Sequence, residues 1–382
     1  MRARSPWLLL TTLAASCALE SFERGAARPP DEKPPDPVAL CTAAGLPSRP
    51  DAVDEDGETF VVALRSVTWP DLPLADPGDG GHGPKDEVPG FDLDGRCSCT
   101  ADVKFACITA PGALLGNHCD DEEGRDNNLA IAFAPLSAVA PSNLTTLFSD
   151  AAEVGAWSLL IEVRGYGGGF DDPRVEVATY SAVGFEGIGG PSWNGQDLWD
   201  VRADSFAVDG RLVQPEPISF DPDAYVADGT LVARLPWLDL NLSIDQVEGL
   251  VRISQARLTA KVESLPFGTG LAEGTIGGWF ADEDILRFLS SYRFKPFGEN
   301  AKSAFLCNDP SDTVYKVFRS TACRAADGRL DEGSPDPACN AVSVGLGFTA
   351  DPANLGDVVE VPFPPSACEE GRDPRFDACP SN

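Results

Sequence analysis

Histidine and ready-made catalytic motifs are scarce in this sequence. Only two histidines occur among 382 residues, His82 and His118, and both lie in stretches expected to be loops. No G-x-S-x-G elbow, Ser-x-x-Lys pair, H-E-x-x-H motif or P-loop is present, which argues against the common hydrolase, metalloprotease and nucleotide-binding classes. A glycosidase needs only two carboxylates about 5–10 Å apart, and the sequence favours no particular pair. We therefore expect a non-catalytic protein.

Positive charge is also scarce. Lysine and arginine total 29 against 60 aspartates and glutamates, so the formal net charge is −31. A chain of this charge repels phosphate backbones, which argues against a nucleic-acid partner. Acidity of this kind is typical of a well-solvated surface, and it also supplies oxygen ligands for cations.

The N-terminus carries a short apolar segment behind a basic start. Arg2 and Arg4 precede "WLLLTTLAAS" at residues 7–16, which is too short to span a bilayer and ends in small residues. This layout predicts a secretory signal peptide over residues 1–16.

Cys17 follows the apolar segment directly. The stretch "LAASC" resembles the lipobox of bacterial lipoproteins, although Ala14 stands where leucine is more usual. The resemblance implies a lipid on Cys17, and Ala18 is similar to the outer-membrane sorting pattern of that class. Acyl chains would then anchor the protein to the outer membrane, with its body periplasmic or surface-exposed. The alternative is an ordinary cleaved signal peptide.

Ten cysteines remain when Cys17 is set aside. An even number in an exported chain predicts up to five structural disulfides. We expect the four at 97–119 to pair among themselves and Cys41 to pair with a cysteine of the tail, which would join both ends of one domain over residues 41–382. The ten cysteines are Cys41, Cys97, Cys99, Cys107, Cys119, Cys307, Cys323, Cys339, Cys368 and Cys379.

The rest of the chain is predicted to be mainly β. Residues 17–40 form a lipidated, proline-rich stalk, residues 156–280 a β core, and residues 305–382 a cysteine-rich tail of short loops. The expected fold is a disulfide-stapled antiparallel sandwich or barrel-like domain with one or two short helices, for which 142–154 and 281–294 are the candidates. The expected strands are 58–69, 156–165, 174–183, 206–213, 224–235, 250–265 and 340–350, with Asp-Gly turns inside the fourth and fifth.

The segment 90–128 combines acids with cysteines. Asp92-x-Asp94-Gly95 resembles the start of a calcium loop, but the rest of the EF-hand pattern is missing. A disulfide from Cys119 to Cys97 or Cys99 would bring a second acidic group close and supply six or more oxygens for Ca²⁺. The alternatives are a solvated acidic loop and a zinc site built from the four cysteines and His118. The candidate calcium ligands are Asp92, Asp94, Asp120, Asp121, Asp126 and Asn127.

The same segment carries a further resemblance. The pattern "GFDLDG…C…CDDEEGRDN" is similar to a motif in uncharacterised exported lipoproteins of high-GC Gram-negative bacteria. The resemblance covers about 40 residues and implies a shared module rather than an activity.

Two tryptophans stand close together in "PSWNGQDLWDV", residues 191–201. Trp193 and Trp199 flank Asn194 and Asp197, and aromatic faces beside amides and acids are typical of sugar sites. Packing of both rings in the β core is the alternative.

These observations together favour a lipid-anchored outer-membrane or surface protein that acts as a non-catalytic binding or structural module, with Ca²⁺ as its candidate ion. The runner-up is a cell-envelope protein that binds or hydrolyses glycans.

Overall fold

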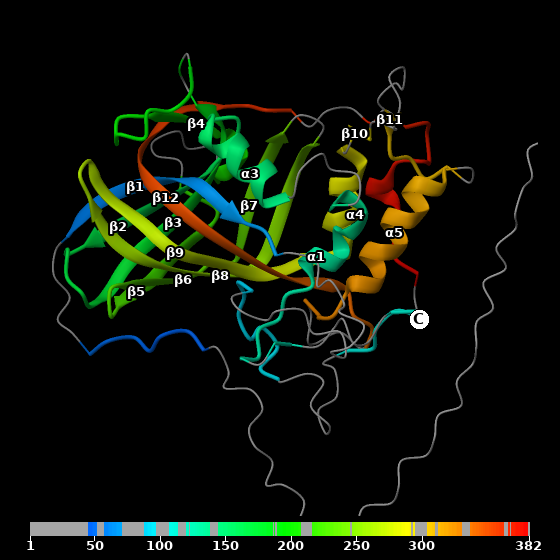
Figure 1. Cartoon of the computed structure of the whole chain (residues 1–382), viewed down its shortest axis with the longest axis horizontal. Coiled ribbons are helices and arrows are strands. Elements are labelled where there is room, and N and C mark those ends of the chain that lie inside the picture. The colour runs from blue at the N-terminus through cyan, green and yellow to red at the C-terminus, as the bar shows by residue number, and fades with distance from the viewer. Residues whose placement is uncertain are drawn as a thin grey trace, which may run out of the picture. The chain divides into compact units, whose positions relative to one another are not determined.

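Eight antiparallel strands close into a barrel in the computed structural model (Figure 1). The ring closes because β12 pairs antiparallel with both β9 and β1, while β3 pairs with β5. Neighbours around the ring follow one another in the sequence, apart from the inserted elements, so the barrel is an up-and-down meander. This confirms the expected antiparallel β class and selects the barrel. The ring strands are β1 (Glu58–Thr68), β2 (Leu159–Tyr166), β3 (Asp172–Phe185), β5 (Phe220–Ala227), β6 (Thr230–Arg234), β8 (Val247–Leu265), β9 (Gly268–Ala281) and β12 (Ala341–Val359).

All described residues belong to one compact unit, residues 40–382. They are residues 45–51, 57–70, 88–96, 107–113, 120–121, 123–137, 144–185, 187, 189–207, 216–244, 247–291, 293–294, 304–309, 312–330, 337–362, 366 and 368–380. The expected signal peptide, Cys17 and the stalk lie outside this part of the chain.

Two strands extend the wall of the barrel. β4 (Leu198–Arg202) pairs antiparallel with β3 and parallel with β12, and β7 (Trp237–Ile244) forms a hairpin with β8. A separate pair joins β10 (Arg293–Phe294) to β11 (Ala304–Phe305).

Alternate residues of the ring strands fill the barrel. An eight-stranded barrel has an interior about wide enough for its own side chains, and the inward positions named below are valine, leucine, isoleucine or alanine. Its core continues into an aromatic group around Trp69. The centroid of the Trp69 ring lies 5.3 Å from that of Phe133 and 4.8 Å from that of Phe148. The inward residues include Val62, Leu64, Ile161, Val163, Val175, Val177, Ala224, Val226, Leu231, Ala233, Leu258, Ala260, Leu271, Ile276, Val344 and Leu346.

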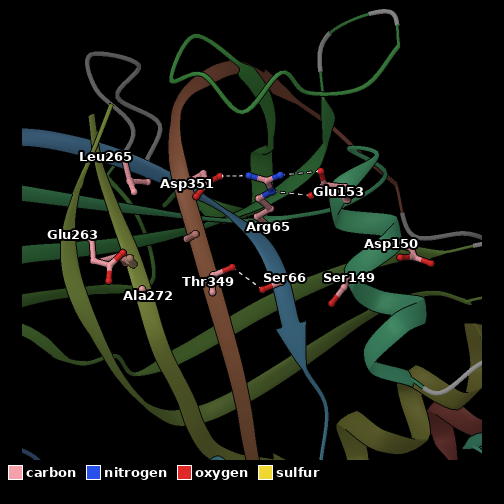
Figure 2. A pocket seen from close by; sticks show the side chains of 12 residues that line it. Arg65, Ser66, Ser149, Asp150, Glu153, Glu263, Leu265, Ala272, Thr349 and Asp351 are labelled. Atoms are coloured by element: carbon pink, nitrogen blue, oxygen red, sulfur yellow. Dashed lines mark hydrogen bonds and ion pairs between the residues drawn. The ribbon is translucent and has the colours of Figure 1, made fainter. Parts of the chain in front are cut away.

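Helices gather at one end of the barrel and along β1. Three of them, α1 (Leu129–Ala132), α4 (Asp282–Ser291) and α5 (Thr313–Ala325), lie together in Figure 1, and α2 (Ala134–Ser137) follows α1. The fifth helix, α3 (Leu144–Glu153), runs beside β1 (Figure 2). Short 3-10 turns occur at Ala203–Ser205 and Pro374–Phe376.

Hydroxyl groups of α3 satisfy the end of β1. The Ser149 hydroxyl lies 3.1 Å from the Val67 nitrogen and 2.9 Å from its carbonyl, and Thr145 binds Trp69 in the same way. These bonds replace strand pairing, because β2 pairs with β1 only as far as Ala63. The helix is thereby fixed along the edge of β1, and its buried side chains join the core of the barrel.

Several local predictions are confirmed. Both expected helices are present as α3 and α4. The predicted turn at Asp228-Gly229 joins β5 to β6, with φ of 48° and 71°. Of the expected strand 206–213, only Phe206 and Ala207 are described, and Phe206 makes an isolated bridge to Pro217.

The expected disulfide pairing is wrong. Cys107 bonds to Cys339, across 232 residues, rather than to a neighbour in the 97–119 segment. The cause is a parallel bridge between Ile108 and Ala338, in which the Ile108 nitrogen donates to Pro337 at 2.8 Å and the Cys339 nitrogen donates to Ile108 at 2.9 Å.

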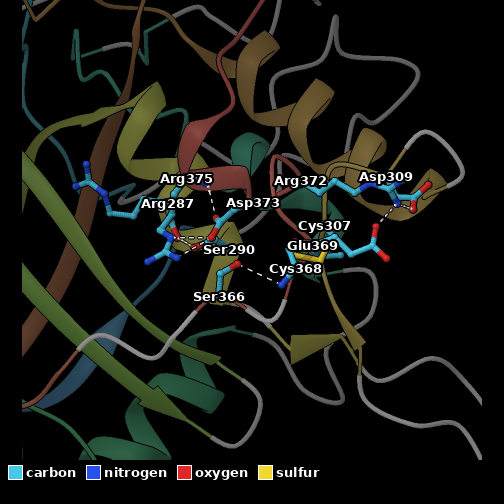
Figure 3. Close-up of a disulfide and its surroundings, with 11 residues drawn as sticks. Arg287, Ser290, Cys307, Asp309, Ser366, Cys368, Glu369, Arg372, Asp373 and Arg375 are labelled. Carbon is cyan, nitrogen blue, oxygen red and sulfur yellow. Dashed lines mark hydrogen bonds and ion pairs between the residues drawn. A yellow bond between two sulfur atoms is a disulfide. The ribbon is translucent and has the colours of Figure 1, made fainter.

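The tail cysteines complete this correction. Cys307 pairs with Cys368 and Cys323 with Cys379, so all five tail cysteines are bonded and none is left for Cys41. Figure 3 shows the Cys307–Cys368 bond, with Arg372 paired to Asp309 nearby. Cys41, Cys97, Cys99 and Cys119 lie outside the described residues.

Among the described helices, none has both the length and the apolar character needed to cross a membrane.

Candidate functional site

Three of the predicted calcium ligands converge beneath the barrel wall. Oxygen atoms of Asp92, Asp94 and Asp126 all lie within 4.8 Å of one another. We call these three residues the aspartate cluster. Asp126 is buried at 6% exposure, whereas the other two are half-buried. An antiparallel bridge between Phe91 and Asp126 holds the two parts of the cluster together.

Each carboxylate of the cluster holds its own loop with one oxygen. Asp92 accepts the Gly95 N–H at 2.7 Å, and Asp94 accepts the Arg96 N–H at 2.8 Å. Asp126 accepts the Leu93 N–H at 2.7 Å. Gly95 permits this tight turn because its φ is 73°. One carboxylate oxygen of each aspartate therefore has no hydrogen bond to the described residues.

Negative charge is concentrated around Asp126. Burial raises its pKa well above the ordinary value, and repulsion from Asp120, Asp327 and Asp94 adds to the effect. Burial is also the main cause of the raised pKa of Asp94. Without a bound cation, burial and neighbouring charge therefore favour the protonated form of Asp126.

Arg257 is the cation that contacts the loop, but it does not bind the carboxylates. Its guanidinium donates to the backbone carbonyls of Asp92 and Leu93, the latter at 3.2 Å. Burial lowers the pKa of Arg257, while the charges of Asp92 and Asp126 oppose this shift. Arg257 thus fixes the loop backbone and leaves the carboxylate oxygens available for an ion.

The other predicted ligands lie beside the cluster. Asp120 is buried, and its charge acts on Asp126. Asp121 accepts the Arg125 N–H at 2.8 Å and lies 3.6 Å from the guanidinium of the same residue. The amide of Asn127 donates to Pro89 at 2.7 Å and accepts from Leu129 at 3.3 Å. Asp121 and Asn127 therefore hold the surrounding backbone.

Two further acids were not identified from the sequence: Asp327, whose charge acts on Asp126, and Asp282, which interacts with Asp327. Asp327 follows α5 and accepts the Ser343 N–H at 2.8 Å and its hydroxyl at 2.5 Å. Burial raises its pKa to about 7. Asp282, at the start of α4, also has a pKa of about 7 because of burial, and its Oδ1 has no partner among the described residues. No local pattern indicates either residue, because each reaches this region through the tertiary fold.

The two tryptophans do not form a two-walled site. Trp199 is fully buried, and Trp193 packs against it with ring centroids 5.7 Å apart. The Asp197 carboxylate accepts the N–H groups of Ser192 and Trp193 at 2.9 and 2.6 Å. Asn194 accepts the Gln196 N–H at 3.0 Å. These polar groups hold their own loop, and Trp199 offers no face to a sugar.

Comparison with known proteins gives no relative on which to base a function. No family model matches the chain, no curated protein is similar to it, and no solved structure matches it.

Proposed function

We propose that this chain is an exported lipoprotein of the outer membrane whose barrel is a non-catalytic binding or structural module stabilised by Ca²⁺. In this proposal, Cys17 carries the lipid and the aspartate cluster holds the ion. The disulfides support an oxidising, extracytoplasmic location, because bonds of this kind rarely persist in the cytosol.

The convergence of Asp92, Asp94 and Asp126 carries the calcium proposal. Ca²⁺ binds oxygen ligands at about 2.4 Å, so two of its ligands lie at most about 4.8 Å apart. The three oxygens meet this limit. A divalent ion also offsets the repulsion that disfavours the charged form of Asp126. Water and loop carbonyls would complete the shell of six to eight ligands.

Apolar side chains fill the described interior of the barrel, which leaves its outer surface for contacts with other molecules. The module is consequently proposed to present its outer surface to envelope components.

Calorimetric titration of the full chain with Ca²⁺ tests the ion site. We expect one site per chain and a rise in melting temperature that a chelator reverses. Asp94→Asn removes one charge and should weaken binding at least about tenfold, by analogy with the loss of a buried charged contact. Asp357→Asn is the matched control. Asp357 is exposed on β12, so this substitution removes the same charge at a site away from the aspartate cluster. Equal weakening by both variants, or no binding heat and no thermal shift, would contradict the proposal.

Fractionation of cells tests the anchor separately. The full chain is expected in the outer-membrane fraction, and Cys17→Ser should release it into the soluble fraction. Unchanged fractionation of Cys17→Ser would refute lipid anchoring without affecting the calcium proposal.

A further inference from the structure

A groove of about 480 Å³ lies on the outer wall of the barrel, away from the aspartate cluster. It is bounded by α3, β1, β12 and the β8–β9 hairpin (Figure 2). We call it the outer groove. Its volume falls within the range of about 300–1,000 Å³ that is usual for small-molecule sites.

Arg65 occupies one end of the outer groove and is fully engaged. Its Nε lies 2.8 Å from Glu153 of α3, and its NH1 lies 2.7 Å from Asp351 of β12. Its guanidinium carbon also stands 5.3 Å from the ring of Trp193. Hydrogen bonds to Glu153 and Asp351 raise the pKa of Arg65, so its charge is permanent. These contacts leave Arg65 committed to two of the four carboxylates in the lining.

The other two carboxylates are unpaired among the described residues. Asp150 stands on α3 and Glu263 on β8, and Figure 2 places them on opposite sides of β1 and β12. The nearby Lys261 is engaged by Glu273 and does not neutralise Glu263. One guanidinium against four carboxylates leaves three negative charges in the outer groove. A ligand with two positive charges fits this arrangement.

Apolar side chains lie between the two unpaired acids. Leu265 and Ala272 are half-buried and contribute carbon surface to the lining, and the hydroxyls of Ser66 and Thr349 are bonded to each other at 2.6 Å. An alkyl chain gains from such a floor, whereas its ammonium ends gain from Asp150 and Glu263. The net charge of −31 further attracts cations toward this surface.

We propose that the outer groove binds an aliphatic polyamine, with its ammonium groups on Asp150 and Glu263 and its alkyl chain across Leu265 and Ala272. This function is additional to calcium binding and does not depend on it. The groove size favours a small molecule over a polypeptide, because a specific protein interface buries about 800 Å² on each partner.

The test is calorimetric titration of the full chain with spermidine at about 0.15 M salt, which screens distant charges. We expect saturable binding by spermidine and weaker binding by pentylamine, which carries a single ammonium group. The double variant Asp150→Asn/Glu263→Gln should reduce spermidine affinity about tenfold, since each exposed ion pair contributes up to about fivefold. The matched control is Asp357→Asn/Glu360→Gln, which removes two exposed carboxylates outside the outer groove.

Several outcomes would overturn this proposal. They are absence of spermidine binding, equal loss in the two double variants, and equal affinity for pentylamine. Binding of a trilysine peptide without binding of spermidine would also overturn it and would indicate a basic protein partner. Asp94→Asn should leave spermidine affinity unchanged, so a failure of the calcium site is distinguished from a failure of the outer groove.

Discussion

The aspartate cluster and the outer groove both gather carboxylates, but only the groove includes a guanidinium among them. Arg65 binds Glu153 and Asp351 directly. At the cluster, Arg257 instead binds the backbone carbonyls of Asp92 and Leu93. Arg65 therefore balances part of the negative charge of the outer groove. Arg257 leaves the charge of the aspartate cluster to be balanced by a proton or a bound ion.

Burial separates the two regions further. The side chain of Glu153 is 49% exposed, whereas Asp126 is 6% exposed. Water stabilises exposed carboxylates, so the outer groove tolerates excess negative charge. A buried carboxylate without a cation favours its protonated form. We therefore expect changes near the cluster to affect stability more than changes in the groove.

The largest expected effect is a pH dependence that originates near the cluster. Asp327 and Asp282 have folded-state pKa values of about 7, above the ordinary value of 3.8, because of burial. The folded chain therefore holds protons that the unfolded chain releases. The contribution of these two carboxyl groups to the free energy of unfolding is complete below pH 3.8. It is lost as the pH rises to about 7, and the loss is on the order of several kcal/mol.

Urea unfolding in chelator between pH 4 and 8 measures this effect. Asp282→Asn should flatten the decline and raise stability at pH 8, because it removes a buried charge whose Oδ1 has no partner among the described residues. Asp357→Asn should retain the wild-type profile. A wild-type stability that does not fall between pH 4 and 7 would contradict the assignment.

The next effect comes from the arginine that holds the cluster loop. Arg257→Met should lower the free energy of unfolding by about 2 kcal/mol, because the carbonyls of Asp92 and Leu93 lose a charged donor. Denaturant titration with chelator measures this loss. Added Ca²⁺ should recover part of this lost stability. An equal loss with and without Ca²⁺ would show that Arg257 does not contribute to the ion site.

A smaller effect is expected from the arginine of the outer groove. Arg65→Met should cost about 1 kcal/mol, because its ion pairs are exposed to solvent and its aliphatic stem is retained. The same titration should show no change in the response to Ca²⁺. A loss larger than that of Arg257→Met would reverse the comparison between the two regions.

The smallest effect on stability is expected from the unpaired acids of the outer groove. Glu263→Gln should change the free energy of unfolding by less than about 0.5 kcal/mol, because Glu263 is exposed and makes no ion pair among the described residues. Thermal unfolding without ligand measures this change. A clear destabilisation would show that Glu263 is structural rather than available for a ligand.

Local signals in the sequence account for the features that were predicted correctly. The Asp228-Gly229 turn follows from residues that tolerate positive φ, and α4 follows from its apolar periodicity. The sequence also predicted that Asp92 and Asp94 lie close to the acidic residues after Cys119, which include Asp126. The described bridge between Phe91 and Asp126 accounts for this approach without reference to the predicted disulfide.

Features that depend on tertiary contacts were missed. β9 is rich in glycine, which obscured its strand pattern, and a Cβ at Gly277 would lie 2.6 Å from the ring of Phe91. The sequence alone gives no measure of this close approach. α5 was assigned to loops, although the Asp312 carboxylate caps it by accepting the Val314 and Tyr315 N–H groups at 2.9 and 3.1 Å. Cysteine spacing likewise does not specify pairing, as Cys107–Cys339 shows.

A crystal structure of the protein grown in Ca²⁺, with an anomalous difference map, tests the calcium site most directly. We predict one peak in the aspartate cluster, about 2.3–2.6 Å from oxygens of Asp92, Asp94 and Asp126. Arg257 should remain on the backbone carbonyls of Asp92 and Leu93. A cluster without a peak at saturating Ca²⁺, or with the Arg257 guanidinium among the three carboxylates, would contradict the proposed ion site.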